Sequence, residues 1–241
     1  MALRAEVNYV GVSVGKLDQS CELFSRKGHL LYLDTLDDTF EQIPAHPRIK
    51  PWKIGVFFSG LERSLVGSGF NMRVDEARSA AYALKAYAGM PYGKIRETQL
   101  RDVPVEVFEQ YKDRLPEPWR LRAEHYYSEQ ARVERGAEAW RAGDIEAYGR
   151  ISTESGHSSI YSWQTGSPEL KALYEIIVRQ DGVYGGRFSG GGFKGCCMAL
   201  IDPAYEEKIA EAVQREYLAV FPALSERYQY CGCESADGIA L

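Results

Sequence analysis

No stretch of this 241-residue sequence approaches the roughly 20 consecutive apolar residues that a membrane-spanning helix needs. Residues 1–6 also lack the long apolar core of a secretory signal peptide. No stripe of basic residues stands out, because 29 Lys and Arg are set against 34 acidic residues, for a net charge of −5. These absences predict a cytoplasmic protein whose partners are neither membranes nor nucleic acid.

Cysteine is scarce, and its five copies occur without a secretion signal, which favours reduced thiols. Cys231 and Cys233 are two residues apart, so a strand would place both thiols on one side. Cys196 and Cys197 would point to opposite faces. Because a structural zinc site needs four ligands at a more regular spacing, we expect no metal site and buried, reduced thiols.

Hydrolase signatures are also missing. The sequence holds no Gly-x-Ser-x-Gly element, and none of its four histidines stands at a recognisable catalytic spacing from a nucleophile. His125 lies in a predicted helix, where we expect a packing or ion-pair role.

Glycine, by contrast, is abundant in residues 183–197, where six of fifteen positions are glycine. Such a run is costly to order and is typical of a backbone that approaches a ligand closely, most often a phosphate. Residues 190–195 formally match Gly-x-Gly-x-x-Gly, but the apolar run 197–201 predicts a strand after it, where a dinucleotide site needs a helix. Two interpretations stay open: a phosphate-adjacent loop, or a tight turn at the entrance of a strand.

The hydrophobic pattern predicts an α+β protein with helices packed on one face of an antiparallel sheet. Proline-rich residues 37–51 are interpreted as a connection and a domain boundary. The predicted strands are residues 6–14, 29–34, 53–58, 197–201 and 228–233, and the predicted helices are residues 17–26, 72–88, 119–141, 145–155, 169–179 and 204–221.

Two segments are candidates for a site. Asp18 lies where a predicted strand gives way to a helix, so the positive end of the helix dipole would keep its carboxylate ionised. It could accept a proton from a substrate hydroxyl, or serve only as a helix-capping acid. Residues 64–71 are small and polar, which suits either a ligand-binding loop or an ordinary helix entry.

Four segments, in order, resemble the galactokinase branch of the GHMP small-molecule kinases. Gly15-Lys16-Leu17-Asp18-Gln19 is similar to the catalytic Gly-x-x-Asp-Gln of that family, and residues 68–73 are similar to its Ser-x-Tyr-Asn-x-Arg. The third segment is Arg122-Ala123-Glu124-His125 with residues 143–155, and the fourth is the glycine-rich run. Residues 58–61, 122–126 and 187–190, with Cys196-Cys197, look closer to galacturonate kinases than to ordinary galactokinases.

This resemblance implies a GHMP-kinase C-terminal domain, a ferredoxin-like sandwich, over residues 51–241, preceded by a remnant of the N-terminal domain over residues 1–50. It implies ATP-dependent phosphorylation of galacturonate or galactose at the anomeric hydroxyl, with ATP and Mg²⁺ as cofactors and a small sugar or sugar acid as substrate.

The resemblance also assigns roles to residues. Asp18 would be the catalytic carboxylate, and Gly15, Asp18 and Phe70 would bind the sugar. Phe70 stands where the family has a tyrosine, so it can stack but cannot hydrogen-bond. Lys194 replaces a glycine and would meet a uronate carboxylate or stay solvated. The phosphate-adjacent loop would be formed by Ser189, Gly190, Gly191 and Gly192.

Two family motifs that precede the Asp-Gln segment are missing from this sequence: an arginine-bearing sugar motif and the Gly-Leu-Ser-Ser-Ser-Ala loop that cradles ATP. The chain alone is therefore expected to be a poor catalyst. It could be a truncated kinase, one half of a split kinase, or a non-catalytic sugar-binding or sensing module. Predicted strands 7–14 and 29–34 would lack sheet neighbours, which predicts a separate N-terminal half as partner, or self-association.

Overall fold

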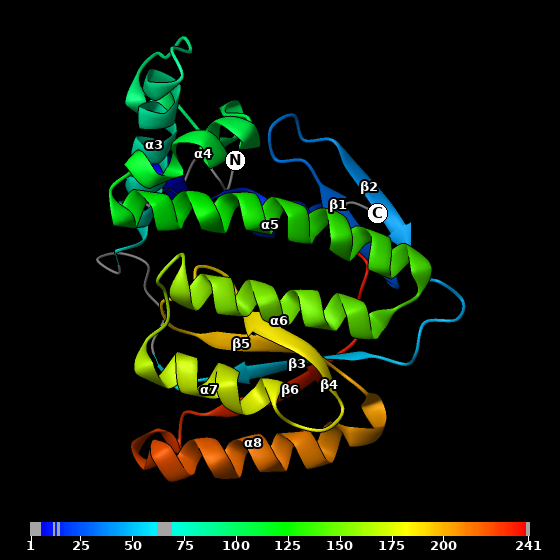
Figure 1. Ribbon diagram of the computed structural model, residues 1–241. Coiled ribbons are helices and arrows are strands. Elements are labelled where there is room, and N and C mark those ends of the chain that lie inside the picture. The colour runs from blue at the N-terminus through cyan, green and yellow to red at the C-terminus, as the bar shows by residue number, and fades with distance from the viewer. Residues whose placement is uncertain (1–5, 12, 14, 62–68, 240–241) are drawn as a thin grey trace.

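The computed structural model describes residues 6–11, 13, 15–61 and 69–239 (Figure 1). The strands are β1 (His29–Leu33), β2 (Phe40–Pro44), β3 (Lys53–Phe58), β4 (Val183–Phe188), β5 (Cys196–Ile201) and β6 (Gln229–Cys233). The main helices are α2 (Leu17–Phe24), α3 (Phe70–Tyr87), α4 (Val105–Tyr111), α5 (Glu117–Ala142), α6 (Ile145–Tyr161), α7 (Pro168–Val178) and α8 (Glu206–Val220).

Four of the strands form an antiparallel sheet in the order β4-β5-β3-β6. Along the chain, β3, α7, β4, β5, α8 and β6 come in the order of a ferredoxin-like unit, with α3 to α6 inserted between β3 and α7. The register places Phe57 of β3 opposite Cys197 of β5 and Tyr230 of β6. The predicted α+β, ferredoxin-like fold class is confirmed.

The largest core lies between this sheet and helices α7 and α8. Along each strand and helix, the apolar residues that face this core recur with the period of that element. Phe57 of β3 and Val213 of α8 are fully buried in it. Further buried members are Leu170, Leu173, Ile177, Ile201 and Ile209.

The other face of the sheet is partly covered as well, by α6, which packs on β4, with α5 packed beside α6. Leu200 of β5 alternates with the core residues on either side of it, and it packs against a second buried cluster, which contains Ala137 and Trp140 of α5 and Ile145 of α6. Figure 1 shows α5 running beside α6, which lies next to the sheet. The prediction of helices on one face was therefore too simple.

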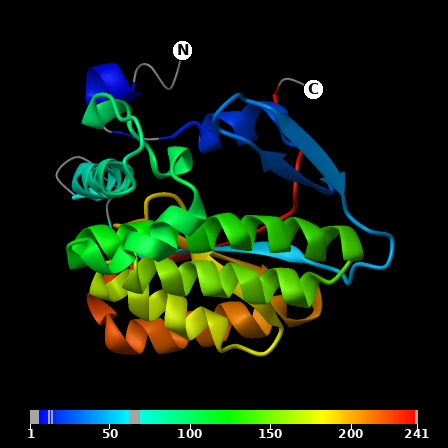
Figure 2. The same ribbon diagram turned by 45° about the horizontal axis from the view of Figure 1, so that its top comes forward.

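Strands β1 and β2 form a separate two-stranded antiparallel hairpin, with Leu31 opposite Gln42. It rests on the C-terminal half of α5, where the Trp140 Nε1 donates a hydrogen bond of 3.0 Å to the Ile43 carbonyl oxygen. Trp52 packs edge-on against Trp140, with ring centroids 5.4 Å apart. Figure 2 shows the hairpin beside this end of α5.

A further apolar cluster joins α3, α4 and the N-terminal half of α5. Leu84 and Ala123 are fully buried in it, and Phe108 of α4 stacks on Tyr127 with ring centroids 4.7 Å apart. Helix α5, at 26 residues, thus contributes to two separate clusters. Within the described residues, no helix combines the length and the apolar character needed to cross a membrane.

The sequence predictions differ from the structure at three further places. Residues Glu6–Val10 form a π-helical turn where a strand was predicted, and Gly11, at a φ of 78°, leaves the extended region. The proline-rich connection 37–51 contains β2, which tolerates Pro44 because proline is its last residue. Strand β4 was not predicted, because Gly185 and Gly186 lower its strand propensity.

Candidate functional site

The glycine-rich run is divided between a strand and a loop. Its first half belongs to β4, and the loop proper, residues 189–195, connects β4 to β5 as a hairpin. Three glycines of the loop have positive φ values, which residues other than glycine rarely adopt. The values are 70° at Gly190, 74° at Gly192 and 102° at Gly195. The loop follows one strand and precedes another, so it suits neither a dinucleotide motif nor a P-loop.

The base of this loop is fixed by buried hydrogen bonds. The Gly195 carbonyl oxygen accepts from the Ser59 N–H at 2.8 Å and from the Ser59 hydroxyl at 2.7 Å. The Ser59 carbonyl oxygen in turn accepts from the Tyr217 hydroxyl at 2.8 Å. Burial raises the pKa of Tyr217, which keeps this hydroxyl a donor. These hydrogen bonds therefore hold the base of the loop in a fixed position.

The two sides of the loop differ in the space around them. A Cβ on Gly192 would lie 2.8 Å from the Phe188 ring and 2.9 Å from the Thr165 hydroxyl. A Cβ on Gly190 would meet no atom within 4 Å. One side of the loop is thus packed against the protein, while the other presents backbone to open space, which is suitable for close approach by a phosphate.

Phe70, the predicted sugar-contacting residue, meets this loop. Its ring lies edge-on to that of Phe193, with centroids 6.4 Å apart and an interplanar angle of 75°. Gly69, at a φ of 83°, precedes α3 and turns the chain so that Phe70 begins the helix. Residues 64–68 of the predicted polar loop lie outside the described residues.

Asn71, the next residue, holds the segment that leads to Asp18. Its side-chain oxygen accepts from the Ser13 N–H at 2.9 Å, and its side-chain nitrogen donates to the Gly11 carbonyl oxygen at 2.9 Å. Asp18 itself is an exposed residue in the first turn of α2. The helix position predicted for Asp18 is therefore observed, although the described residues before it, 6–11, 13, 15 and 16, form no strand.

Gly15 is exposed just before this helix, and Lys16 at its N-terminal cap forms an ion pair with Asp38. The structure thus brings the loop, Phe70 and the tethered residues Gly11 and Ser13 into one chain of contacts. Whether Gly15, Asp18, Phe70 and Ser189–Gly192 act on a ligand stays a prediction.

A buried arginine, Arg122, holds the turn of residues 162–165, against which the packed side of the glycine-rich loop lies. Arg122 is fully buried, and its Nε donates to Glu76 at 2.6 Å while Nη2 donates to the Gln164 side chain at 2.9 Å. Its Nη1 donates to the Ser162 carbonyl oxygen. Burial lowers the pKa of Arg122, and Glu76 opposes that shift. This turn continues into Thr165, against which Gly192 packs.

In the sequence, Arg122 is part of one of the segments that resemble the galactokinase branch, but that resemblance assigned it no role. The signal that was available is an arginine followed directly by alanine on the apolar side of a long helix, since arginine is rarely buried unless paired.

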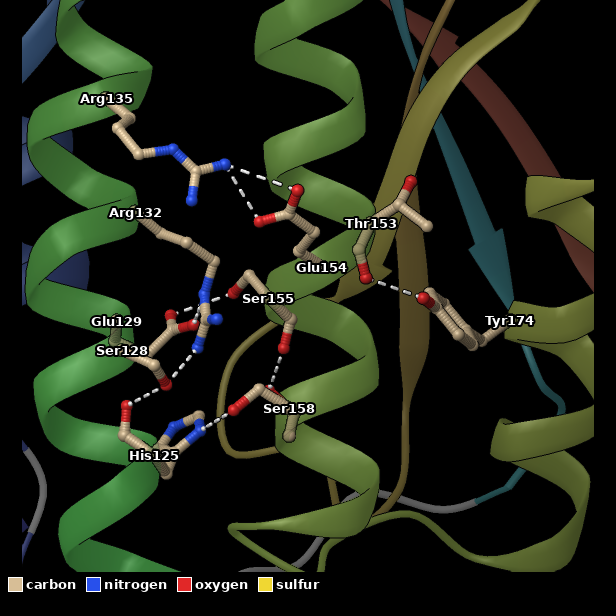
Figure 3. A network of polar contacts seen from close by, with 11 residues as sticks. His125, Ser128, Glu129, Arg132, Arg135, Thr153, Glu154, Ser155, Ser158 and Tyr174 are labelled. Atoms are coloured by element: carbon tan, nitrogen blue, oxygen red, sulfur yellow. Dashed lines mark hydrogen bonds and ion pairs between the residues drawn. The ribbon is translucent and has the colours of Figure 1, made fainter.

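Polar contacts join helices α5 and α6, beginning at His125, three residues after Arg122; Figure 3 shows them. The His125 ring hydrogen-bonds the Ser158 hydroxyl at 2.8 Å, and Ser155 donates to Glu129 at 2.8 Å. Burial lowers the pKa of His125 to about 4, so the ring is neutral near pH 7. Its place between two helices agrees with the predicted packing role.

Among the described residues, no three His, Cys, Asp or Glu side chains gather as a metal site. A groove of about 330 Å³ runs between the end of β1 and α5, around the ion pair of Asp34 with Arg101. None of the predicted site residues lines this groove.

Comparisons with known proteins show what this chain is similar to. Residues 137–219 match the family model described as GHMP kinases C terminal. The chain is 41% identical over 215 residues to a galacturonokinase from Arabidopsis thaliana, covering 88% of this chain and 50% of the relative. It is 33% identical over 239 residues to a galactokinase from Roseiflexus, covering 99% of this chain and 58% of the relative.

Among solved structures, Lactococcus lactis galactokinase complexed with galactose superimposes with a TM-score of 0.84 at 25% identity. That match covers 98% of this chain and 58% of the galactokinase chain. The chain thus spans about half to three fifths of the length of the relatives it matches.

Proposed function

Because this chain carries a GHMP kinase C-terminal domain and has the fold of galactokinase, we propose that it forms one wall of an ATP-dependent sugar-1-kinase site. The reaction would transfer a phosphoryl group to the anomeric hydroxyl of galacturonate or galactose. One observation carries the proposal: Phe193 of the glycine-rich loop contacts Phe70, and the adjacent Asn71 tethers the segment that leads to Asp18.

In this proposal Asp18 receives or balances the proton of the anomeric hydroxyl. Its exposed position in the first turn of α2 leaves the carboxylate open to a substrate. Gly15, just before the helix, adds no side chain that would hinder the sugar. Phe70 offers a ring face to the sugar but no hydroxyl, unlike the tyrosine that the family has there.

The glycine-rich loop would lie beside the transferred phosphoryl group, with Ser189 to Gly192 as its nearest residues. The open space at Gly190 and the left-handed backbone there fit a phosphate. Mg²⁺ and ATP, when bound, would supply the phosphoryl group and neutralise its charge. Because the described residues gather no metal ligands of their own, Mg²⁺ would depend mainly on the phosphates and on groups outside them.

Galacturonate is placed ahead of galactose as substrate. The support is the 41% identity to a galacturonokinase, against 33% to a galactokinase, together with phenylalanine at position 70. Lys194 is exposed on the loop, where it is free to reach a uronate carboxylate or to remain in solvent.

Full activity would need a second part that carries the ATP loop. This chain spans about half the length of its relatives, and its sequence lacks that motif. Among the described strands, β1 and β2 pair only with each other, so both outer edges of the hairpin are available for further strands. The second part would add there.

A phosphate-transfer assay tests the proposal. The purified chain is given ATP, Mg²⁺ and either sugar, alone and together with the product encoded directly upstream of its gene. We expect transfer only with the upstream product, and faster transfer to galacturonate. Transfer by the chain alone would show that the second part is unnecessary, and no transfer in any arm, with no sugar binding by calorimetry, would refute the assignment.

Sugar binding without transfer in any arm would instead identify a sensing module. Asp18→Asn should abolish any transfer while leaving the melting temperature unchanged. Glu22→Gln, an exposed change on the same helix, is the matched control and should keep full activity.

A further inference from the structure

Cys231 and Cys233 lie side by side near the end of β6. Their Sγ atoms are 3.6 Å apart, and Cys231 is exposed while Cys233 is half-buried. Among the described strands, β6 pairs with β3 alone, so this pair of thiols lies on an edge strand. A separation of 3.6 Å is close to that at which a nucleophile attacks.

The residue between them, Gly232, leaves the space beside the strand to the Glu206 side chain. A Cβ on Gly232 would lie 1.9 Å from the Glu206 carboxylate, which accepts from the Tyr230 hydroxyl at 3.1 Å and pairs with Lys53 at 2.6 Å. Glu206, Tyr230 and Lys53 thus fill one side of the strand. The two thiols occupy the other side, opposite Val56 and Ile54 of β3.

We propose that Cys231 and Cys233 are a redox-active dithiol, which a peroxide converts to an intrachain disulfide. The exposed Cys231 sulfur attacks the peroxide, so that Cys231 becomes a sulfenic acid and one water leaves. Cys233 then attacks the Cys231 sulfur, the S–S bond forms and a second water leaves. Two thiols are oxidised by two electrons, and one hydrogen peroxide is reduced to two waters.

The order of attack follows from the surroundings of the two thiols. Burial, followed by the hydrogen bond with Cys231, raises the pKa of Cys233. Cys233 is therefore the weaker nucleophile toward peroxide in solution and acts as the resolving thiol, where proximity offsets its lower thiolate fraction.

Closing the bond must shorten the strand. Residues two apart on a strand have Cα atoms about 6.6 Å apart, near the upper end of the roughly 4.4–6.8 Å that a disulfide spans. Because β6 is hydrogen-bonded on one side only, its end can move at modest cost. Strained, exposed disulfides are readily reduced again, which suits a reversible modification.

The movement would reach α2 through residues 234–239, here called the C-terminal strap. In Figures 1 and 2 the chain leaves β6 and rises from the sheet to the N-terminal region. The strap hydrogen bonds are Gly28 N–H to Ser235 Oγ at 2.9 Å, Lys27 N–H to Asp237 Oδ1 at 2.8 Å, Gly238 N–H to Ser25 O at 2.7 Å and Ile239 N–H to Glu22 O at 2.9 Å.

These contacts hold the C-terminal end of α2, the helix whose first turn carries Asp18. Cys233 directly precedes the strap, so pulling Cys233 toward Cys231 also pulls the strap away from α2. We therefore expect oxidation to loosen α2. Any effect on phosphoryl transfer rests on the function proposed above, but loosening of α2 does not.

Mass spectrometry of the full chain tests the chemical step. The reduced protein is treated with equimolar hydrogen peroxide and digested after alkylation. We expect the peptide with Cys231 and Cys233 to lose two thiols, while Cys196 and Cys197 stay alkylatable once the protein is unfolded. Cys231→Ser should prevent the loss, Cys233→Ser should leave a sulfenic acid that dimedone traps at Cys231, and Cys21→Ser should change nothing.

Disulfide-linked dimers in place of the intrachain bond, or oxidation of Cys21 as fast as that of the pair, would overturn the proposal. Hydrogen exchange tests the second step. In the oxidised protein the amides of residues 20–28 should exchange about tenfold faster, equivalent to ~1.4 kcal/mol, whereas those of α8 should not change. Cys231→Ser should abolish the difference, and a disulfide without faster exchange in this region would refute the coupling to α2.

Discussion

Gly149 of α6 and Gly185 of β4 touch backbone to backbone. A Cβ on Gly185 would lie 1.8 Å from the Gly149 carbonyl oxygen, and a Cβ on Gly149 would lie 2.1 Å from the Tyr184 carbonyl oxygen. The helix therefore rests directly on the edge strand of the sheet. This contact fixes the distance between α6 and β4, the strand that leads into the glycine-rich loop. Because α5 packs on α6, it also fixes the position of α5 relative to this strand.

Gly185→Ala should destabilise the protein by about 3 kcal/mol or more, because the helix must move away from β4 to admit a methyl group. The melting temperature would fall by about 6–12 °C. Gly136→Ala is the matched control, since its Cβ would lie 3.6 Å from the nearest atom, and it should change stability by less than about 1 kcal/mol. Equal melting temperatures for the two variants would contradict the close contact.

His125 should make stability depend on pH. Its folded-state pKa of about 4 lies below the roughly 6.5 of an exposed histidine, so the unfolded chain takes up a proton first. Stability is complete above pH 6.5 and falls as the pH drops toward 4, by up to about 3 kcal/mol. Urea denaturation at each half pH unit measures the slope.

His125→Gln should flatten this slope between pH 6.5 and 4, whatever its effect on stability at pH 7. His157→Gln, at an exposed position of α6, should leave the slope as it is. The carboxyl groups whose pKa is lowered, such as that of Glu129, lose their stabilising effect only below the ordinary pKa of a glutamate, so they do not account for the upper part of this window. An unchanged slope in His125→Gln would contradict the prediction.

Arg122→Met should destabilise the protein by about 3–5 kcal/mol, because it leaves the partly buried Glu76 and the Ser162 carbonyl without their main donor. Arg73, 3.2 Å from Glu76, compensates in part. Arg135→Met removes an ion pair with Glu154 that is half-exposed on both sides, and should cost less than about 1 kcal/mol. Similar losses of stability in urea denaturation would argue against a special role for Arg122.

Asn71→Ala should release the segment before Asp18 without unfolding the protein. It removes the hydrogen bonds to Gly11 and Ser13, both on the exposed surface, so the melting temperature should fall by no more than a few degrees. Amide exchange at Ser13 should increase clearly. Asn71→Asp keeps the acceptor for the Ser13 N–H and should show an intermediate effect; full protection of Ser13 in Asn71→Ala would refute the tether.

The regular elements of the C-terminal half could be predicted from the sequence because their signals are local. Ser167 accepts from the Leu170 N–H at the start of α7, and Gly143 ends α5 in the left-handed conformation, as their residue types suggest. Strand β4 escaped prediction because Gly185 is required by a contact with α6, which is distant in sequence. The strap is likewise invisible locally, since its partners are about 210 residues away.

The candidate site was predicted by resemblance more than by residue pattern. Asp18 on its own has the pattern of a helix-capping acid, and only the order of four segments suggested that it shares a site with Phe70 and the loop. The structure supplies the physical links, such as the side-chain amide of Asn71, which a one-dimensional pattern cannot distinguish from an ordinary surface asparagine.

The docking of the β1–β2 hairpin on α5 also has an optical consequence. Trp140 and Trp52, two of the four tryptophans, meet edge-on where the hairpin joins the helix, and the Trp140 indole N–H is bound to Ile43. Detachment of the hairpin would expose both indoles to water at once and shift their fluorescence to longer wavelength. The protein thus contains its own spectroscopic probe of the joint between its N-terminal hairpin and its longest helix.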